Sequence, residues 1–168
     1  MKVHMTCYWL VDVADESSWT EYRRPSTDED ELACGHLLPS AFLRAVRMEG
    51  CGITPFGMLS YAGVGKYILD ESVAHPWGDD ALGGGLIPFT SIAIDRKFLK
   101  MGSQYHVCQL LGRIMPNGTV HSGIVHAVDC GGGIVGDKID FFVGSKSNWK
   151  GMLAWLPEFV DIEEVVHS

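Results

Sequence analysis

The fold of this chain is decided by the stretch Ala127-Val128-Asp129-Cys130-Gly131-Gly132-Gly133-Ile134-Val135-Gly136-Asp137-Lys138-Ile139-Asp140-Phe141-Phe142. The pattern predicts a strand that ends in Asp129, a sharp turn through three consecutive glycines, and a second strand that carries Asp140. The two carboxylates are 140 − 129 = 11 positions apart. Crossing segments can therefore bring them to one site.

Asp140 is the unusual residue of this stretch. It lies between Ile139 and Phe141, and a charge among apolar side chains is costly unless it is paired or neutralised. Desolvation and a neighbouring Asp129 would raise the pKa of one carboxyl group of the pair, as a general acid requires. The alternative is structural: Asp129 and Asp137 are turn residues, and Asp140 is a surface residue of an edge strand.

The stretch also resembles a known family, the three-aspartate (3D) domain of the membrane-bound lytic murein transglycosylase A group. The family pattern A-x-D-x-G-G-x-I-x-G-x-x-I-D-x-F is matched from Ala127 to Phe142 at every specified position. Upstream, the segment from Ser91 to Ser103 resembles the family's A-x-D-P-x-x-I-P-L-G-[ST] and supplies Asp95, with Arg96 and Lys100 in place of the two prolines.

The resemblance implies a fold that is mainly β. We expect a six-stranded double-psi β-barrel with one or two inserted helices, and a single domain over residues 1–168 with a helical insertion at about 35–50. Two short matches support this order of elements, Thr6-Cys7-Tyr8 and Gly52-Ile53-Thr54-Pro55-Phe56-Gly57.

Local patterns along the chain predict the individual elements. Residues 38–48 keep helical spacing of apolar residues, followed by Gly50 as a stop signal. A polar loop with a short helix is expected over 12–34, and Pro116-Asn117-Gly118 predicts a hairpin turn. The predicted strands are residues 3–11, 57–61, 87–94, 104–114, 119–128 (buried on both faces) and 138–143.

The resemblance also implies an activity, the non-hydrolytic cleavage of the β-1,4 bond between N-acetylmuramic acid and N-acetylglucosamine to 1,6-anhydro products, without a cofactor. Asp140 would be the general acid/base, Asp129 its structural and electrostatic partner, and Asp95 a more distant supporting carboxylate. The expected substrate-binding residues are Tyr8, Thr54 and Ser91 from the matched segments, and Trp77 as an aromatic platform in the Gly-rich loop 76–85.

Two other functions remain open at the level of sequence. One is a non-catalytic double-psi barrel that binds glycan or a protein. The resemblance suggests that this chain lacks the second domain that forms one wall of the glycan groove in the large transglycosylases, which favours this alternative. The other is a polysaccharide hydrolase, which ordinarily needs a second well-placed carboxylate.

Charge and hydropathy exclude several partners. The net charge of −8 leaves no basic stripe for nucleic acid, and no apolar run of 18 residues predicts a membrane span. The segment Met1–Val13 is too polar for a signal peptide. We expect a protein of the cell wall, the periplasm or the secreted fraction, with peptidoglycan strands as partner and an immunity or inhibitor protein if it is a secreted effector.

Cysteine and histidine spacing predicts no metal site. The five cysteines show no CxxC or CxxH pattern, and the seven histidines show no spacing such as HExxH. The cysteines are interpreted as small buried hydrophobes, with one disulfide as the alternative in an oxidising compartment.

Overall fold

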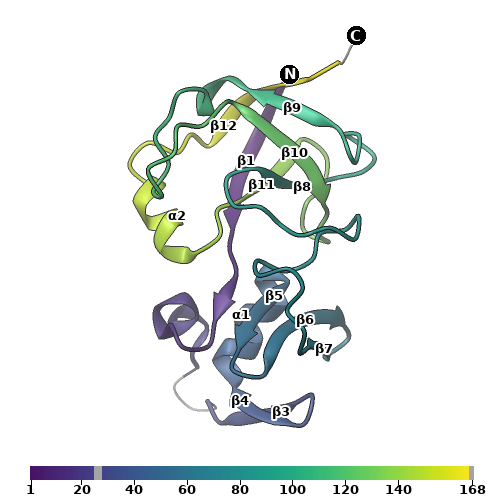
Figure 1. The fold of residues 1–168 in the computed structure, drawn as a ribbon, viewed down its shortest axis with the longest axis vertical. Helices are drawn as coiled ribbons and strands as arrows, with labels where there is room; N and C mark the ends of the chain where they lie inside the picture. The colour runs from purple at the N-terminus through teal and green to yellow at the C-terminus, as the bar shows by residue number, and fades with distance from the viewer. Residues whose placement is uncertain (25–27, 167–168) are drawn as a thin grey trace. The chain divides into compact units, whose positions relative to one another are not determined.

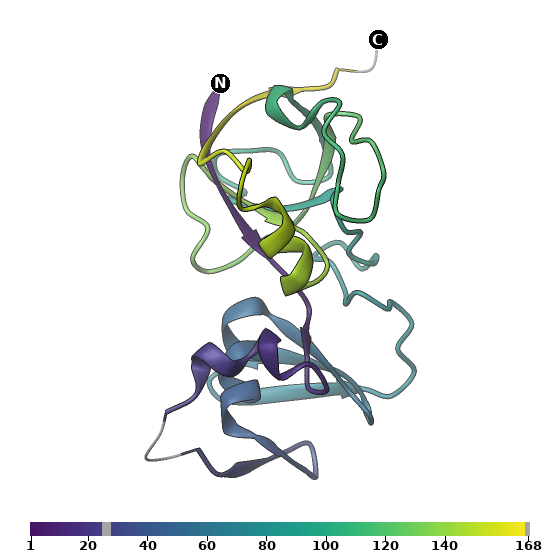
Figure 2. The ribbon, with the colours of Figure 1, turned by 90° about the vertical axis from the view of Figure 1, so that its left-hand side faces the viewer.

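The computed structural model describes residues 1–24 and 28–166, and its chain divides into two compact units. The first comprises Met1–Tyr8 with Asp79–Ser168, and the second comprises Trp9–Gly78. Their strands can be followed as two groups in Figures 1 and 2. The structure thus differs from the expected single barrel, because the predicted helical insertion belongs to a unit with a core of its own.

Six strands of the first unit pair into a closed ring, in the order β1-β11-β8-β10-β9-β12 (Figure 1). Antiparallel pairing of β12 with β1 closes it, while β1 pairs β11 and β8 pairs β10 in parallel. The first unit is therefore mainly β, as predicted. The strands are β1 (Lys2–Tyr8), β8 (Ser91–Ile94), β9 (Gln104–Val107), β10 (Ile124–Asp129), β11 (Lys138–Phe142) and β12 (Phe159–Glu164).

The ring buries the inner side of its strands, because successive side chains in a strand point to opposite faces, and β8 is buried at all four positions. On β11 the interior residues Ile139 and Phe141 are fully buried, and on β10 Val125 and Ala127 are too. Burying such an Ile or Phe side chain contributes about 1.5–3 kcal/mol. The prediction that β10 is buried on both faces is wrong, because its alternate residues remain partly exposed.

Glycine and turn geometry explain where the ring strands differ from prediction. The strand expected over 119–128 begins only at Ile124, because Gly123 before it has φ +82°. The strand expected over 104–114 ends at Val107 and continues as the 3-10 turn η3 (Cys108–Leu110). The hairpin turn at 116–118 is confirmed as an isolated bridge between Ile114 and Val120.

Two elements of the first unit were not predicted, β12 and the helix α2 (Lys146–Met152). Helix α2 lies outside the ring next to β1 (Figure 2). The Ser145 hydroxyl caps it by accepting a hydrogen bond from the Asn148 backbone N–H at 3.2 Å. Seven residues are too few for an apolar periodicity to be legible in the sequence.

The second unit contains the predicted helix, α1 (Ser40–Glu49), which ends at Gly50 with φ +96°. Phe42 and Val46 of α1 are fully buried. Their side chains pack so closely on Gly52 that a Cβ at this position would collide with both. The loop expected over 12–34 holds η1, η2 and β3, and its residues 25–27 lie outside the described part. The remaining elements are β2 (Val11–Asp12), β5 (Cys51–Thr54), β6 (Gly57–Gly63) and β7 (Lys66–Asp70) in one sheet, the hairpin β3 (Asp30–Ala33) and β4 (His36–Pro39), and the 3-10 turns η1 (Glu16–Ser18) and η2 (Thr20–Tyr22).

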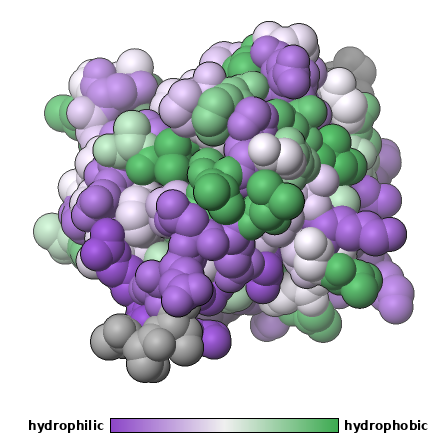
Figure 3. All heavy atoms as spheres, turned by 90° about the horizontal axis from the view of Figure 1, so that it is seen from below, coloured by the Kyte–Doolittle hydropathy of each residue, from purple (hydrophilic) through white to green (hydrophobic). Residues whose placement is uncertain are grey.

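Some apolar side chains remain on the surface of the second unit. Leu32 and Leu37 lie opposite each other in the β3–β4 hairpin, and both are exposed. Figure 3 shows apolar side chains next to polar ones on one face of the molecule. Within the described ranges, no helix is both long and apolar enough to span a membrane.

One glycine of the second unit supports a direct prediction. Gly57 has φ +139°, and a Cβ there would collide with the backbone carbonyl of Asp70 on the paired strand. We expect Gly57→Ala to destabilise the unit by about 2–4 kcal/mol, from backbone strain and overpacking together. The control is Gly50→Ala. Gly50 also has positive φ, but open space surrounds it, so this substitution should lower the free energy of unfolding by clearly less. Equal urea midpoints for the two variants would contradict this account.

His121 anchors the long connection between β9 and β10 to the ring. It is buried, its Nδ1 accepts a hydrogen bond from the Gly123 backbone N–H at 2.8 Å, and its Nε2 lies 2.7 Å from the Phe89 carbonyl oxygen. Both ring nitrogens are therefore satisfied when the imidazole is neutral and carries its proton on Nε2. Burial lowers the pKa of His121, against the opposing effect of the Phe89 carbonyl.

A lowered histidine pKa makes stability depend on pH with a defined sign. The unfolded chain protonates His121 near its ordinary pKa of about 6.5, whereas the folded chain resists protonation. The stabilisation is therefore complete above that pH and decreases as pH falls towards the lower folded-state pKa. We expect the urea midpoint to fall more between pH 7.5 and 5.5 for the wild type than for His121→Gln. The same fall in both proteins would show that His121 is not the group responsible.

Candidate active site

The two aspartates of the motif lie in one row across four adjacent strands. Thr6 of β1 is opposite Asp140 of β11, Asp140 is opposite Ala93 of β8, and Ala93 is opposite Asp129 of β10. Residues directly opposite one another share a face of a sheet. With strands roughly 4.8 Å apart, the Cα atoms of the two aspartates are about 10 Å apart, separated by the small side chain of Ala93.

A β-bulge at Val128 places Asp129 in this row. Ala127 pairs with Ile92 and Asp129 with Ala93, so Val128 is an extra residue without a partner in the register. In a regular strand Asp129 would point to the same side as the fully buried Ala127. The bulge turns the carboxylate to the outer face instead, a known use of bulges next to functional sites.

Asp140 is partly buried and accepts one strong hydrogen bond. The Thr6 hydroxyl donates to its Oδ1 at 2.7 Å. Burial raises the pKa of Asp140, and the charge of Asp129 adds to this rise, while the Thr6 hydrogen bond and Lys138 oppose it. A carboxyl group with a raised pKa can remain protonated where an ordinary aspartate is ionised.

Asp129 is also partly buried but accepts two hydrogen bonds. The Tyr8 hydroxyl donates to Oδ2 at 2.8 Å, and the Cys130 backbone N–H donates to Oδ1 at 2.9 Å. Burial raises the pKa of Asp129 and Asp80 contributes in the same direction, whereas the two hydrogen bonds and Arg96 oppose the rise. Each oxygen of this carboxylate thus has a donor.

Asp95 has a different environment from the other two aspartates. Its Oδ2 accepts from the Gly136 backbone N–H at 2.8 Å and its Oδ1 accepts from the Lys97 backbone N–H at 2.9 Å. These two amides lower its pKa. Asp95 therefore links the loop 131–136 to the turn after β8. It holds the two segments together by accepting hydrogen bonds from their backbone N–H groups.

The expected substrate-binding residues are distributed over both units. Ser91 is buried on β8, and its hydroxyl accepts from the Ile87 backbone N–H at 2.9 Å. Thr54 and Trp77 belong to the second unit. The Thr54 hydroxyl is buried and donates to the Gly57 carbonyl oxygen at 2.9 Å, whereas Trp77 is partly exposed. Thr54 and Trp77 thus belong to a different compact unit from the three aspartates.

Tyr8 and Thr6 are the residues for which sequence reasoning fell short. Tyr8 stays a predicted substrate-binding residue, but its hydrogen bond to Asp129 was not foreseen, and Thr6 was given no role. The available signal was the pair of hydroxyl residues at alternate positions of the first strand, on one face of it.

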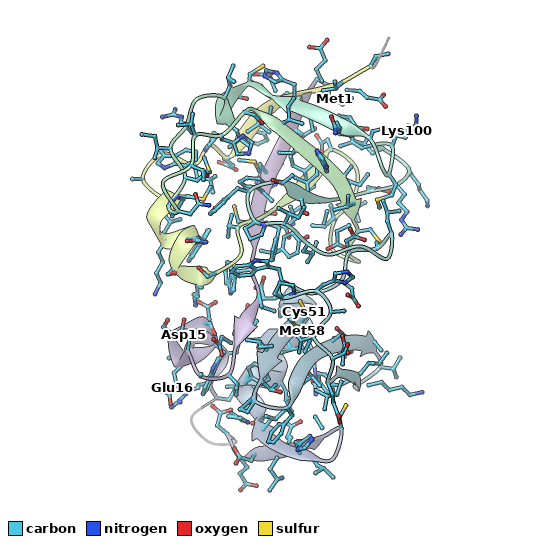
Figure 4. All side chains as sticks on the ribbon, in the orientation of Figure 1. Met1, Asp15, Glu16, Cys51, Met58 and Lys100 are labelled. Atoms are coloured by element: carbon cyan, nitrogen blue, oxygen red, sulfur yellow. The ribbon has the colours of Figure 1, made fainter. Side chains whose placement is uncertain are left out.

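Two further features bear on the choice of site. A shallow depression at one end of the first unit is lined by residues that include Met1, Lys100 and Tyr105, and contains none of the three aspartates (Figure 4). In the described part of the chain, no three His, Cys, Asp or Glu residues are grouped so that they could hold a metal ion.

The role of Asp95 can be tested through the amides that it binds. We expect Asp95→Ala to speed hydrogen exchange at the Gly136 and Lys97 amides, because each loses its acceptor, while interior amides such as that of Ile139 change little. Asp137→Ala is the matched control, since Asp137 is an exposed carboxylate of the same loop. Unchanged exchange at Gly136 in Asp95→Ala, measured by NMR, would show that the carboxylate does not hold the loop.

Comparisons with known proteins find a family that matches the part of the chain that holds the three aspartates. The family described as the 3D domain matches residues 90–153, a segment that contains Asp95, Asp129 and Asp140. No curated protein matches the chain.

Solved structures extend the likeness beyond this segment. Escherichia coli MltA with bound chitohexaose is 15% identical with a TM-score of 0.61, over 97% of this chain and 71% of that chain. A second structure of MltA from E. coli is 14% identical with a TM-score of 0.59, over 99% and 73%. The lytic transglycosylase LtgG of Burkholderia pseudomallei is 14% identical with a TM-score of 0.53, over 97% and 71%.

The coverage reaches beyond the ring. A match over 97% of this chain includes residues of the second unit. At 14–15% identity the likeness establishes the fold. The resemblance predicted from the aspartate motif is thereby confirmed: residues 90–153 match the 3D domain, and the chain has a fold similar to that of MltA.

Proposed function

We propose that this protein is a peptidoglycan lytic transglycosylase that cleaves the N-acetylmuramic acid–N-acetylglucosamine β-1,4 bond to 1,6-anhydro products. The observation that carries the proposal is the environment of Asp140, a partly buried carboxylate with a raised pKa, in a row with Asp129 within the segment that matches the 3D domain. The similar fold of MltA, which has been solved with bound chitohexaose, supports a glycan as the ligand.

The proposed reaction needs one proton carrier. Protonated Asp140 donates its proton to the glycosidic oxygen, and the bond from that oxygen to the muramoyl anomeric carbon breaks. The Asp140 carboxylate then takes the proton of the muramoyl 6-hydroxyl, whose oxygen closes on the anomeric carbon. The nucleophile belongs to the sugar, so its position is fixed by the substrate and the enzyme regains its proton at the end.

Asp129 contributes to this scheme through its charge. A carboxylate about two strand spacings from Asp140 favours the protonated form of Asp140 before the reaction. The same charge stabilises the positive charge that develops at the anomeric carbon. Asp95 acts further away, by holding the loop between the two aspartates.

The finer points of the fold and of substrate binding belong to the same proposal. We propose that the ring is a double-psi β-barrel, which its two parallel pairs support. The four residues expected to bind substrate, Tyr8, Thr54, Ser91 and Trp77, stay predictions, with Trp77 as an aromatic sugar platform. The hydroxyls of Tyr8, Thr54 and Ser91 also have protein partners.

The substrate sets the place of action and the partner. Peptidoglycan strands are the proposed partner, and the cell wall, outside the cytoplasm, is the proposed place of action. An immunity or inhibitor protein stays a prediction.

A second candidate is a polysaccharide hydrolase. The observation that favours it is the presence of two carboxylates on one face, since ordinary glycosidases use a pair of them. The two reactions differ in their products, because a hydrolase leaves a reducing end and a transglycosylase leaves a 1,6-anhydro end.

The test is product analysis with purified peptidoglycan. We expect the wild type to release anhydromuropeptides by mass spectrometry, and Asp140→Asn to lose activity by about 10²–10⁴-fold, because a general acid is removed. Activity of the wild type should fall as pH rises through the raised pKa of Asp140. Asp137→Asn is the control, and should retain activity because that side chain is exposed.

The alternatives have their own outcomes. Reducing-end products would assign hydrolysis, and glycan binding without any product would assign a binding module. Full activity of Asp140→Asn with anhydro products would remove Asp140 from its role.

A further inference from the structure

We propose that Thr6 and Tyr8 are positioning residues that assign different protonation states to the two aspartates, so that Oδ2 of Asp140 carries the proton and Asp129 stays charged. The chemical use of this arrangement rests on the proposed function. The hydrogen bonds that create it can be tested without any substrate.

A single strand supplies both donors. Thr6 and Tyr8 are two positions apart on β1, so their side chains leave the same face. Thr6 donates to Asp140 of the neighbouring strand, whereas Tyr8 reaches Asp129 past two intervening strands, β11 and β8. The phenol ring of Tyr8 packs on Phe142, with 5.0 Å between ring centroids, which holds it in this direction.

The two carboxylates differ in how many of their oxygens are occupied. Asp129 accepts from Tyr8 at Oδ2 and from the Cys130 N–H at Oδ1. A proton on Asp129 would therefore have to compete with one of these donors. Asp140 accepts from Thr6 at Oδ1 only, and no hydrogen bond to its Oδ2 exists among the described residues. A proton on Oδ2 leaves the Thr6 hydrogen bond intact, so it is the oxygen available to face a glycosidic oxygen.

The charged and titratable groups around the pair are few. Asp80 and Arg96 act on Asp129 with opposite signs, and Lys138 lies beside Asp140. Cys7 lies between the two donors in sequence, and its partial burial, together with the charge of Asp140, raises the pKa of its thiol to about 12 and keeps it neutral. The pKa of Asp140 is thus set by its burial, Thr6, Lys138 and Asp129, and that of Asp129 by its burial, Tyr8, the Cys130 N–H, Asp80 and Arg96.

The two donors should move the pKa of Asp140 in opposite directions. The Thr6 hydrogen bond favours ionised Asp140, so its loss raises the pKa of Asp140. The Tyr8 hydrogen bond favours ionised Asp129, so its loss makes Asp129 easier to protonate. Neutral Asp129 no longer raises the pKa of Asp140, which then falls. Loss of packing alone predicts no such opposition of sign.

The experiment is a pH titration of the aspartate carboxyl carbons by NMR in the wild type, Thr6→Val, Thr6→Ser and Tyr8→Phe. We expect an upward shift of the Asp140 pKa in Thr6→Val and its return toward the wild-type value in Thr6→Ser, which restores the hydroxyl. In Tyr8→Phe we expect the Asp129 pKa to rise and that of Asp140 to fall. Shifts of Asp140 in one direction in Thr6→Val and Tyr8→Phe, or no shift in either, would overturn the proposal.

Kinetics give the second readout. We expect Thr6→Val to lower kcat about tenfold with little change in KM, as for one lost hydrogen bond to the proton carrier. The basic limb of its pH profile should move to higher pH, and that of Tyr8→Phe to lower pH. If no protein in the series forms anhydro product, the proposed function fails, while the NMR titration still decides the roles of Thr6 and Tyr8.

Discussion

The site depends on the parallel pairing of β1 with β11. This pairing sets Thr6 opposite Asp140 although the two residues are 134 positions apart in the chain. A partly desolvated carboxylate needs a donor in a fixed place, and a neighbouring strand provides one with little freedom to move. The same strand carries Tyr8 to Asp129. One register thus determines the surroundings of both aspartates, and a slip by one residue would turn both hydroxyls away from them.

Much of the ring could be predicted from sequence, because its information is local. The motif from Ala127 to Phe142 places two aspartates, a glycine turn and a strand, and these features lie where the family pattern implies. The helix at Ser40–Glu49 could be predicted from the spacing of its apolar residues and from Gly50 as a stop signal. Short elements whose stability comes from tertiary contacts, such as β12, were not.

The details that matter most for chemistry could not be predicted from the sequence. The extra residue at Val128 has no signature in the sequence, because a bulge is defined by the partner strand and not by the residue itself. The contacts of Tyr8 and Thr6 depend on pairing over more than 120 positions. Asp95 was expected to support the site from a distance, but its backbone partners could be found only in three dimensions.

The position of β1 in the ring has a consequence for how the chain folds. The second unit, Trp9–Gly78, is continuous in sequence, so its contacts can form early and locally. Strand β1 precedes it, and its partners among the described strands are β11 and β12, which come much later in the sequence. The ring therefore has high contact order and bears the full entropy of closing a long loop. Thr6 and Tyr8 can therefore meet the two aspartates only after β11 has been made and has paired with β1.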